Sequence, residues 1–149
     1  MRALTAAAIC ATCAIAGVTP PAVANAQGGG QQSLYDRLGG RTAISAVVDD
    51  FVGNVAHDKR INKFFAHADI PHLKMELVDQ LCQATGGPCT YTGKDMKTAH
   101  RGMGIRNRDF NALVQDLGKS LKNFRVAKRD QAQIVAVLSP LRKDIVEAK

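Results

Sequence analysis

One histidine, His100, lies in a setting that suits metal coordination. Met96 precedes it by about one helical turn, and Gly102 and Gly104 follow it. An imidazole nitrogen is a common ligand of iron and other transition metals. A surface histidine in a basic loop fits the same spacing, so the spacing alone leaves both interpretations open.

Apolar and aromatic residues elsewhere in the chain could complete such a site. Leu73, Leu77 and Leu81 recur at steps of four, which places them on one face of a helix. Phe64 and Phe65 form an aromatic pair. A haem needs a nitrogen ligand, an aromatic packing edge and a dry apolar cover. The sequence contains candidates for each of these parts.

The elements that would position these residues are helices. From Ser33 onward the apolar residues recur at three- and four-residue steps. We expect N-caps at Ser33, Thr42 and Asp69, and a kink at Pro140 in the last helix. No segment alternates with a period of two, so the predicted fold class is all-α. The expected helices cover approximately residues 33–38, 42–56, 61–65, 70–85, 95–100, 109–122 and 128–146.

The N-terminus has the pattern of a secretory signal peptide. Arg2 is the only charged residue before Asp36, and residues 3–18 form an apolar, Ala-rich run. A membrane anchor is the alternative, but this run is shorter than the roughly 20 residues needed to span a bilayer. Ala24 and Ala26 are small residues of the kind that signal peptidase recognises. We expect cleavage after Ala26 and an exported protein, periplasmic or secreted, which meets a membrane only through the signal peptide before cleavage.

The remainder divides into a Gly- and Gln-rich linker, residues 27–32, and one domain, residues 33–149. It contains two cysteines, Cys82 and Cys89. Export permits a disulfide between them, and two free thiols are the alternative. A zinc site is disfavoured because it would need a second close pair of ligands.

The charge pattern disfavours nucleic acid as a partner. The chain has 20 Lys and Arg against 13 Asp and Glu, a net charge of +7. These charges are scattered singly and in pairs and form no long basic run, which is typical of a solvated cationic surface.

In order and spacing, these motifs resemble the group I truncated haemoglobins across residues 33–145. A short first helix that ends in a Gly pair, an aromatic pair, a second Gly break and a histidine segment follow one another as in that family. One Gly pair would mean little, whereas the whole series is specific. The matching segments are residues 34–40, 64–65, 86–88 with 91–93, and 96–105.

The resemblance implies a two-over-two arrangement of helices around haem b, with His100 as the iron ligand. Covalent attachment is not expected, because the Cys10 to Cys13 pair is followed by Ala14 and lies in the signal peptide. The residues that the resemblance places against the haem are Val52, Phe65, Leu73, Leu77, Leu81, Tyr91, Met96 and His100.

The sequence departs from the family above the haem. Many relatives carry a Tyr in the second helix and a Gln in the helix above the haem, and both hold dioxygen by hydrogen bonds. The matching positions here are Val52 and Leu77, with Leu73 one turn earlier. Gln80 is the nearest polar candidate on the adjacent face, with a partly exposed surface residue as the alternative. Without donors we expect faster release of dioxygen and a relative preference for carbon monoxide and nitric oxide.

Residues at the edge of the expected site have two interpretations each. His72 is an internal sixth ligand or a surface residue, and Tyr91 reaches a haem propionate or simply packs. A propionate is also expected to attract a nearby cation, for which the candidates are Lys97, Arg101 and Arg106.

The resemblance therefore implies reversible binding of dioxygen or another diatomic gas, nitric oxide or carbon monoxide. One alternative is an exported haem carrier or a redox or gas sensor in which Cys82 and Cys89 form the switch. Another is a nitric oxide dioxygenase that needs an external electron donor, or a peroxidase-like side activity. We rank binding first because the sequence shows no flavin or nicotinamide segment. A helical module that binds no haem is a further alternative.

Overall fold

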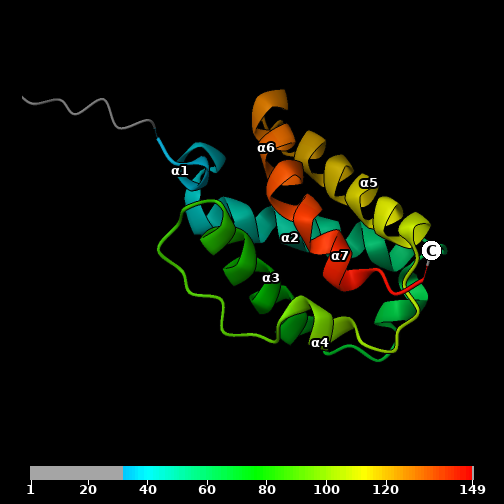
Figure 1. The fold of residues 1–149 in the computed structure, drawn as a ribbon. Helices are drawn as coiled ribbons and strands as arrows, with labels where there is room; N and C mark the ends of the chain where they lie inside the picture. The colour runs from blue at the N-terminus through cyan, green and yellow to red at the C-terminus, as the bar shows by residue number, and fades with distance from the viewer. Residues whose placement is uncertain (1–31, 149) are drawn as a thin grey trace, which may run out of the picture. The chain divides into compact units, whose positions relative to one another are not determined.

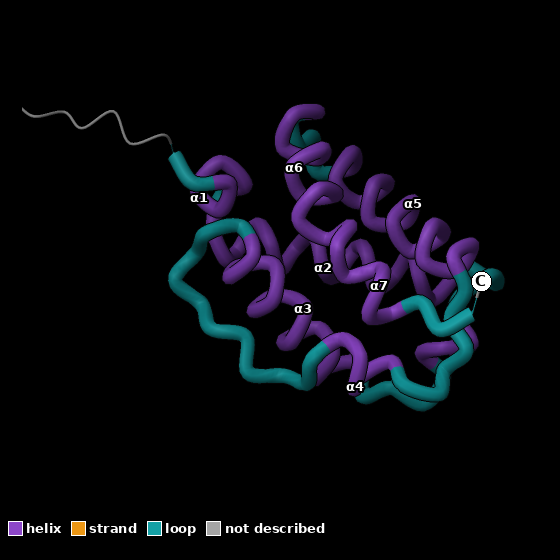
Figure 2. Tube along the Cα trace, in the orientation of Figure 1, coloured by secondary structure: helices purple, strands orange, loops and turns teal. Residues whose placement is uncertain are grey.

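The computed structural model describes residues 32–148, and these are helical apart from turns, loops and one isolated bridge between Arg106 and Ala148. The all-α prediction is confirmed for these residues. The expected signal peptide and all but the last residue of the expected linker lie outside the described residues. Figure 1 shows the order of the helices, and Figure 2 shows the loops that join them.

The first two helices follow each other without a linker. Helix α1 spans Leu34–Leu38, and Ser33 caps it by accepting a hydrogen bond from the Asp36 amide at 3.1 Å. Gly39 has a φ of +94°, a left-handed conformation that ends α1 and places it directly before α2, Gly40–His57. The prediction that Thr42 caps the second helix is therefore wrong, because the cap position belongs to Gly39, three residues before Thr42.

The next segment turns the chain back along α2. A short 3-10 helix, η1, spans Asn62–Phe65, and α3 spans Ile70–Ala84. The carboxylate of Asp69 accepts a hydrogen bond from the His72 amide at 3.1 Å, so the predicted cap is confirmed. Pro71 lies in the first turn, where its missing N–H removes no hydrogen bond.

A long loop connects α3 to the short helix α4, Met96–His100. In Figure 2 this loop, residues 85–95, runs along the outside of the helices. Asp95 begins α4 by accepting a hydrogen bond from the Thr98 amide at 2.9 Å. The loop thus ends at a capped helix whose last residue is His100.

Three further helical segments and one 3-10 turn complete the chain. Helix α5 spans Asn107–Asn123 and α6 spans Lys128–Leu138. The 3-10 turn η2, Ser139–Leu141, and helix α7, Arg142–Ile145, follow. Pro140 lies in η2, so the helix for which a kink was predicted is divided there into α6 and α7, where proline removes a backbone donor.

The helices pack as two pairs. Helix α2 contacts both α3 and α5, and α5 contacts α6 and α7. The pair α2 and α3 faces the pair formed by α5 and the C-terminal helices, which confirms the expected two-over-two arrangement. The buried face of α2 is the stripe that the periodicity predicted, Ile44, Val47, Val48, Phe51, Val52 and Val55. None of the helices among the described residues has the length and apolar character that crossing a bilayer requires.

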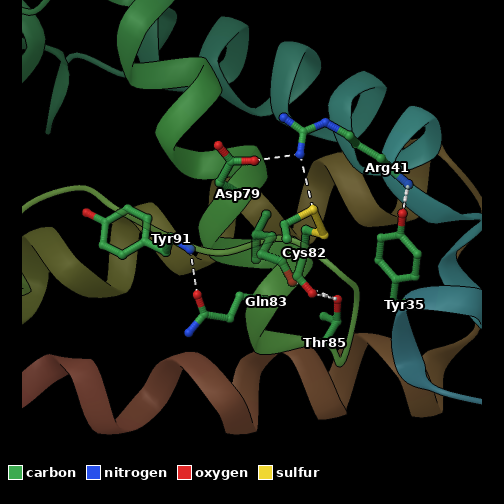
Figure 3. The surroundings of a disulfide bond; sticks show 9 residues. Tyr35, Arg41, Asp79, Cys82, Gln83, Thr85 and Tyr91 are labelled. Atoms are coloured by element: carbon green, nitrogen blue, oxygen red, sulfur yellow. Dashed lines mark hydrogen bonds and ion pairs between the residues drawn. A yellow bond between two sulfur atoms is a disulfide. The ribbon is translucent and has the colours of Figure 1, made fainter.

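Cys82 and Cys89 form a disulfide, which decides between the two interpretations that the sequence left open. Cys82 is fully buried at the end of α3, while Cys89 lies in the loop. Figure 3 shows Arg41 of α2 beside the bond: its guanidinium donates to Asp79 at 2.5 Å and to the Cys89 sulfur at 3.1 Å. The amide of Tyr91 donates to the Gln83 side chain at 2.5 Å. The first half of the loop is thus held to both α2 and α3.

We expect loss of this disulfide to lower the free energy of unfolding by about 2–3 kcal/mol, because the bond closes a short loop in the unfolded chain. Urea unfolding of the protein with and without dithiothreitol measures the difference. Cys89→Ala is the matched control: it should unfold like the reduced protein, and dithiothreitol should not change it further. Equal unfolding midpoints for the oxidised and reduced protein would contradict this expectation.

Candidate functional site

A cavity of about 340 Å³ lies between the two helix pairs. This volume is within the range of about 300–1,000 Å³ that is typical of small-molecule and cofactor pockets. Nearly every element contributes to the wall, from Phe51 of α2 to Ile145 of α7, and most of the side chains are apolar. The two hydrophobic clusters of the protein meet this cavity, so a ligand there would complete the core.

His100 enters the wall from the end of α4. Its Nδ1 lies 2.7 Å from the backbone carbonyl oxygen of Met96, one turn earlier in the same helix. A carbonyl oxygen can only accept, so Nδ1 must carry the proton. In the neutral ring, Nε2 then keeps its lone pair at the opposite corner. A hydrogen bond of this kind is the usual way in which a protein orients a metal-ligating histidine.

The wall formed by α3 consists of the predicted leucine stripe. Leu73, Leu77 and Leu81 all line the cavity. Gln80 also reaches the wall, and its amide lies 3.3 Å from the Met96 sulfur. The Gln80 side chain is therefore directed to α4, which links the two elements that bound this side of the cavity.

Aromatic residues and the C-terminal half of the chain complete the wall. Phe64 and Phe65 of η1 and Phe110 of α5 all line the cavity. The Arg142 guanidinium lies over the Phe110 ring, 4.4 Å from its centre. Asp109 also reaches the wall, but its carboxylate accepts a hydrogen bond from the Arg106 amide at 3.0 Å and begins α5.

The loop after His100 is tied to the C-terminus. The carboxylate of Glu147 accepts hydrogen bonds from the amides of Gly102 and Gly104, at 2.6 and 2.7 Å. These two bonds hold the pKa of Glu147 below its usual value. No sequence pattern predicts these contacts, because more than 40 residues separate Glu147 from the loop.

Comparisons with known proteins agree with this geometry. The family model of the bacterial-like globins matches residues 33–147. A group 1 truncated haemoglobin of Tetrahymena pyriformis is 35% identical over 115 residues, which cover 77% of this chain and 95% of that protein. A group 1 truncated haemoglobin of Mycolicibacterium paratuberculosis is 34% identical, over 76% of this chain and 83% of the relative. The chain belongs to the group 1 truncated haemoglobins.

Solved structures show the same fold for this truncated haemoglobin. The crystal structure of the Tetrahymena pyriformis protein in its Fe(III) form aligns with a TM-score of 0.76 and 34% identity, covering 78% of this chain and all of that one. The 2/2 haemoglobin from Synechococcus, in the cyanomet state and with covalently attached haem, aligns with a TM-score of 0.73 and 29% identity. That alignment covers 77% of this chain and 98% of the other.

Seven of the eight residues that the sequence assigned to the site line the cavity of this truncated haemoglobin: Phe65, Leu73, Leu77, Leu81, Tyr91, Met96 and His100. The structure does not bring Val52 to the cavity wall. Val52 is 9% exposed and belongs to the core cluster, and its neighbour Phe51 lines the cavity instead. Phe51 belongs to the same core cluster. Successive helical residues differ by about 100° in direction, so the Phe51 side chain also reaches the cavity whereas that of Val52 does not.

The histidines other than His100, and the three basic residues near α4, lie at the surface. The side chain of His72 is 62% exposed, and its Nε2 lies 3.6 Å from the Glu76 carboxylate. His57 is exposed and contacts the Gly53 carbonyl oxygen at 2.8 Å, and His67 is exposed. The three basic residues near α4, which are Lys97, Arg101 and Arg106, are also exposed.

Most of the cavity wall formed by α5, the residues just before it and the C-terminal segment was not predicted from the sequence. Ile105, Phe110, Leu113, Leu141 and Ile145 line the cavity. Their helical periodicity was visible, but an apolar stripe has the same pattern whether it packs on another helix or on a ligand.

Proposed function

We propose that this chain binds haem b without a covalent bond and reversibly binds a diatomic gas: dioxygen, nitric oxide or carbon monoxide. The observation that carries the proposal is His100, whose ring is oriented by Met96 at the wall of an apolar cavity. When bound there, haem would supply the iron to which a diatomic gas binds.

The residues of the cavity fit this cofactor. One imidazole with an available Nε2 is the donor set that holds the iron in most globins. Leucine and phenylalanine side chains offer the apolar surface that a porphyrin requires, and they would exclude water from its iron. The two cysteines among the described residues are joined to each other, which supports noncovalent binding in the manner of haem b.

The apolar wall bears on which gas is favoured. Bound dioxygen carries partial negative charge and is stabilised by a hydrogen-bond donor, whereas carbon monoxide and nitric oxide depend less on one. Leu73 and Leu77 present no donor to the cavity, and the amide of Gln80 is directed to Met96. These contacts support a pocket that favours carbon monoxide and nitric oxide relative to dioxygen. A nitric oxide dioxygenase activity would in addition need an external electron donor.

We further propose that the protein works outside the cytoplasm. The N-terminal sequence pattern and the Cys82–Cys89 disulfide support this, because disulfides persist in oxidising compartments. Expression of the whole chain in a bacterium and N-terminal sequencing of the periplasmic product checks the proposal. We expect Gln27 as the first residue, and a cytoplasmic product that begins at Met1 would argue against export.

We expect His100→Gly to lose the Soret absorbance of the haem-reconstituted protein, because no other imidazole lines the cavity among the described residues. Added imidazole should restore the spectrum by occupying the vacated space. His72→Ala is the matched control and should keep the wild-type spectrum, because His72 is exposed. Wild-type protein without a Soret band, or a variant at position 100 with an unchanged one, would overturn the proposal.

We expect Leu77→Gln to slow dissociation of dioxygen from the ferrous protein by roughly 10- to 150-fold, because the added amide donates to a ligand with partial negative charge. Stopped-flow displacement by carbon monoxide measures this rate. Lys74→Gln introduces the same amide on α3 at a residue that pairs with Asp49 outside the cavity, and should leave the rate unchanged. A wild-type rate in Leu77→Gln would show that the apolar wall does not limit retention of dioxygen.

A further inference from the structure

The loop after His100 forms a small binding site that the chain fills with its own carboxylate. The two oxygens of Glu147 accept hydrogen bonds from the amides of Gly102 and Gly104, at 2.6 and 2.7 Å. Gly102 and Gly104 have φ angles of +79° and +63°, a left-handed conformation that favours glycine. Backbone amides that point at one anion in such a turn form a nest. We call residues 102–104 the nest below.

A single residue connects the nest to His100. Met103 lies between the two glycines, and its amide donates a hydrogen bond to the His100 carbonyl oxygen at 3.2 Å. The Met103 side chain lines the cavity beside that of His100. Because the Met103 amide closes the turn that follows α4, a movement of the nest moves the backbone of His100 and the imidazole ring with it.

Helix α4 cannot fix the position of His100 by itself. It has five residues, none of them buried, and a helix of this length is not stable without outside contacts. Asp95 caps its first turn through the Thr98 amide. His100 is at the opposite end, so the contact that holds this end must come from elsewhere in the chain. The Glu147 carboxylate supplies it through the nest.

The backbone around Glu147 is held independently of its carboxylate. The amides of Glu147 and Ala148 both donate to the Ile105 carbonyl oxygen, at 3.0 and 3.2 Å. Ile145 of α7 is 7% exposed and packs with Ile105 in the same hydrophobic cluster. The Glu147 side chain itself is exposed. Removal of the carboxylate therefore leaves the C-terminal segment in place and takes away only its bonds to the nest.

We propose that Glu147 is a positioning residue for the iron ligand: by holding the nest, its carboxylate fixes the direction of the His100 imidazole and so retains haem. This inference rests on the proposed haem function. It adds to that function a residue that does not line the cavity. Loss of a contact that orients a metal-ligating histidine costs about 10- to 100-fold in metal affinity or activity.

Transfer of haem from the ferric, reconstituted protein to excess apomyoglobin tests the proposal. We expect Glu147→Ala to release haem about 10- to 100-fold faster than wild type. Glu147→Asp keeps a carboxylate and should recover part of the difference. Asp144→Asn is the matched control with an expected wild-type rate, because it removes a negative charge from α7 where the side chain has no hydrogen bond or ion pair among the described residues. A wild-type rate in Glu147→Ala overturns the proposal.

Resonance Raman spectroscopy of the ferrous protein without added ligand separates positioning from a general loosening of the structure. The iron–histidine stretching band should shift and broaden in Glu147→Ala, because the ring no longer has one fixed direction. The band should stay at its wild-type position in Asp144→Asn. Faster release of haem in Glu147→Ala with an unchanged band would show loosening alone and overturn the proposal.

A variant on the loop side tests whether Glu147 acts through the nest. In Gly104→Ala the added Cβ meets open space, so the substitution acts only through the left-handed backbone conformation that it disfavours. We expect faster haem release in this variant as well. In the double variant the two effects should not multiply, since both remove the same contact. Effects that multiply would show that Glu147 acts elsewhere and would overturn the proposal.

The haem-free protein provides a readout that does not depend on the cofactor. The amides of Gly102 and Gly104 should exchange hydrogen faster in Glu147→Ala than in wild type, and equal exchange overturns the proposal. A wild-type protein that takes up no haem overturns both the proposed function and this inference. Haem uptake that is lost in His100→Gly, with wild-type release and a wild-type Raman band in Glu147→Ala, overturns the role of Glu147 alone.

Discussion

The orientation of one imidazole ring sets the chemical character of the cavity. The hydrogen bond from His100 Nδ1–H to the Met96 carbonyl oxygen fixes which nitrogen is available. Helix α4 is only five residues long, so it depends on what holds its two ends. Asp95 caps its first turn, and Glu147 binds the amides of the loop after His100. The position of the ring is thus decided by contacts on both sides of a very short helix.

The loop between α3 and α4 is the least regular part of the cavity wall, and it is held by specific contacts in place of helix packing. The Cys82–Cys89 disulfide anchors its beginning, and Arg41 contacts the Cys89 sulfur from α2. Beyond this anchor, the loop brings Tyr91 to the cavity and the backbone of Gly93 against Glu76. A covalent bond at the C-terminal end of α3 therefore supports the loop that closes a cavity otherwise formed by helices.

Polar groups at the cavity are few, and most of them have a structural use. The Gln80 amide is directed to the Met96 sulfur, and the Asp109 carboxylate begins α5. Glu76 is different, because one of its oxygens is buried without a hydrogen-bond donor among the described residues. In an apolar surrounding a single carboxylate has a large effect on any ligand that carries charge or a proton.

Local patterns in the sequence determined the helices, two of their caps and the place of His100 at the end of a short helix. The stripes on α2 and α3, the cap at Asp69 and the interruption at Pro140 all follow from interactions within a few residues, which periodicity and residue type report directly. The tertiary structure decided what depends on distant contacts. Tertiary packing brings Phe51 and not Val52 to the cavity wall, and it pairs Cys82 with Cys89. It also joins Glu147 to the loop after His100 and places Gly93 against Glu76. A sequence pattern cannot distinguish a helix face that meets a cavity from one that meets another helix, because both faces are apolar, and only packing determines which is which.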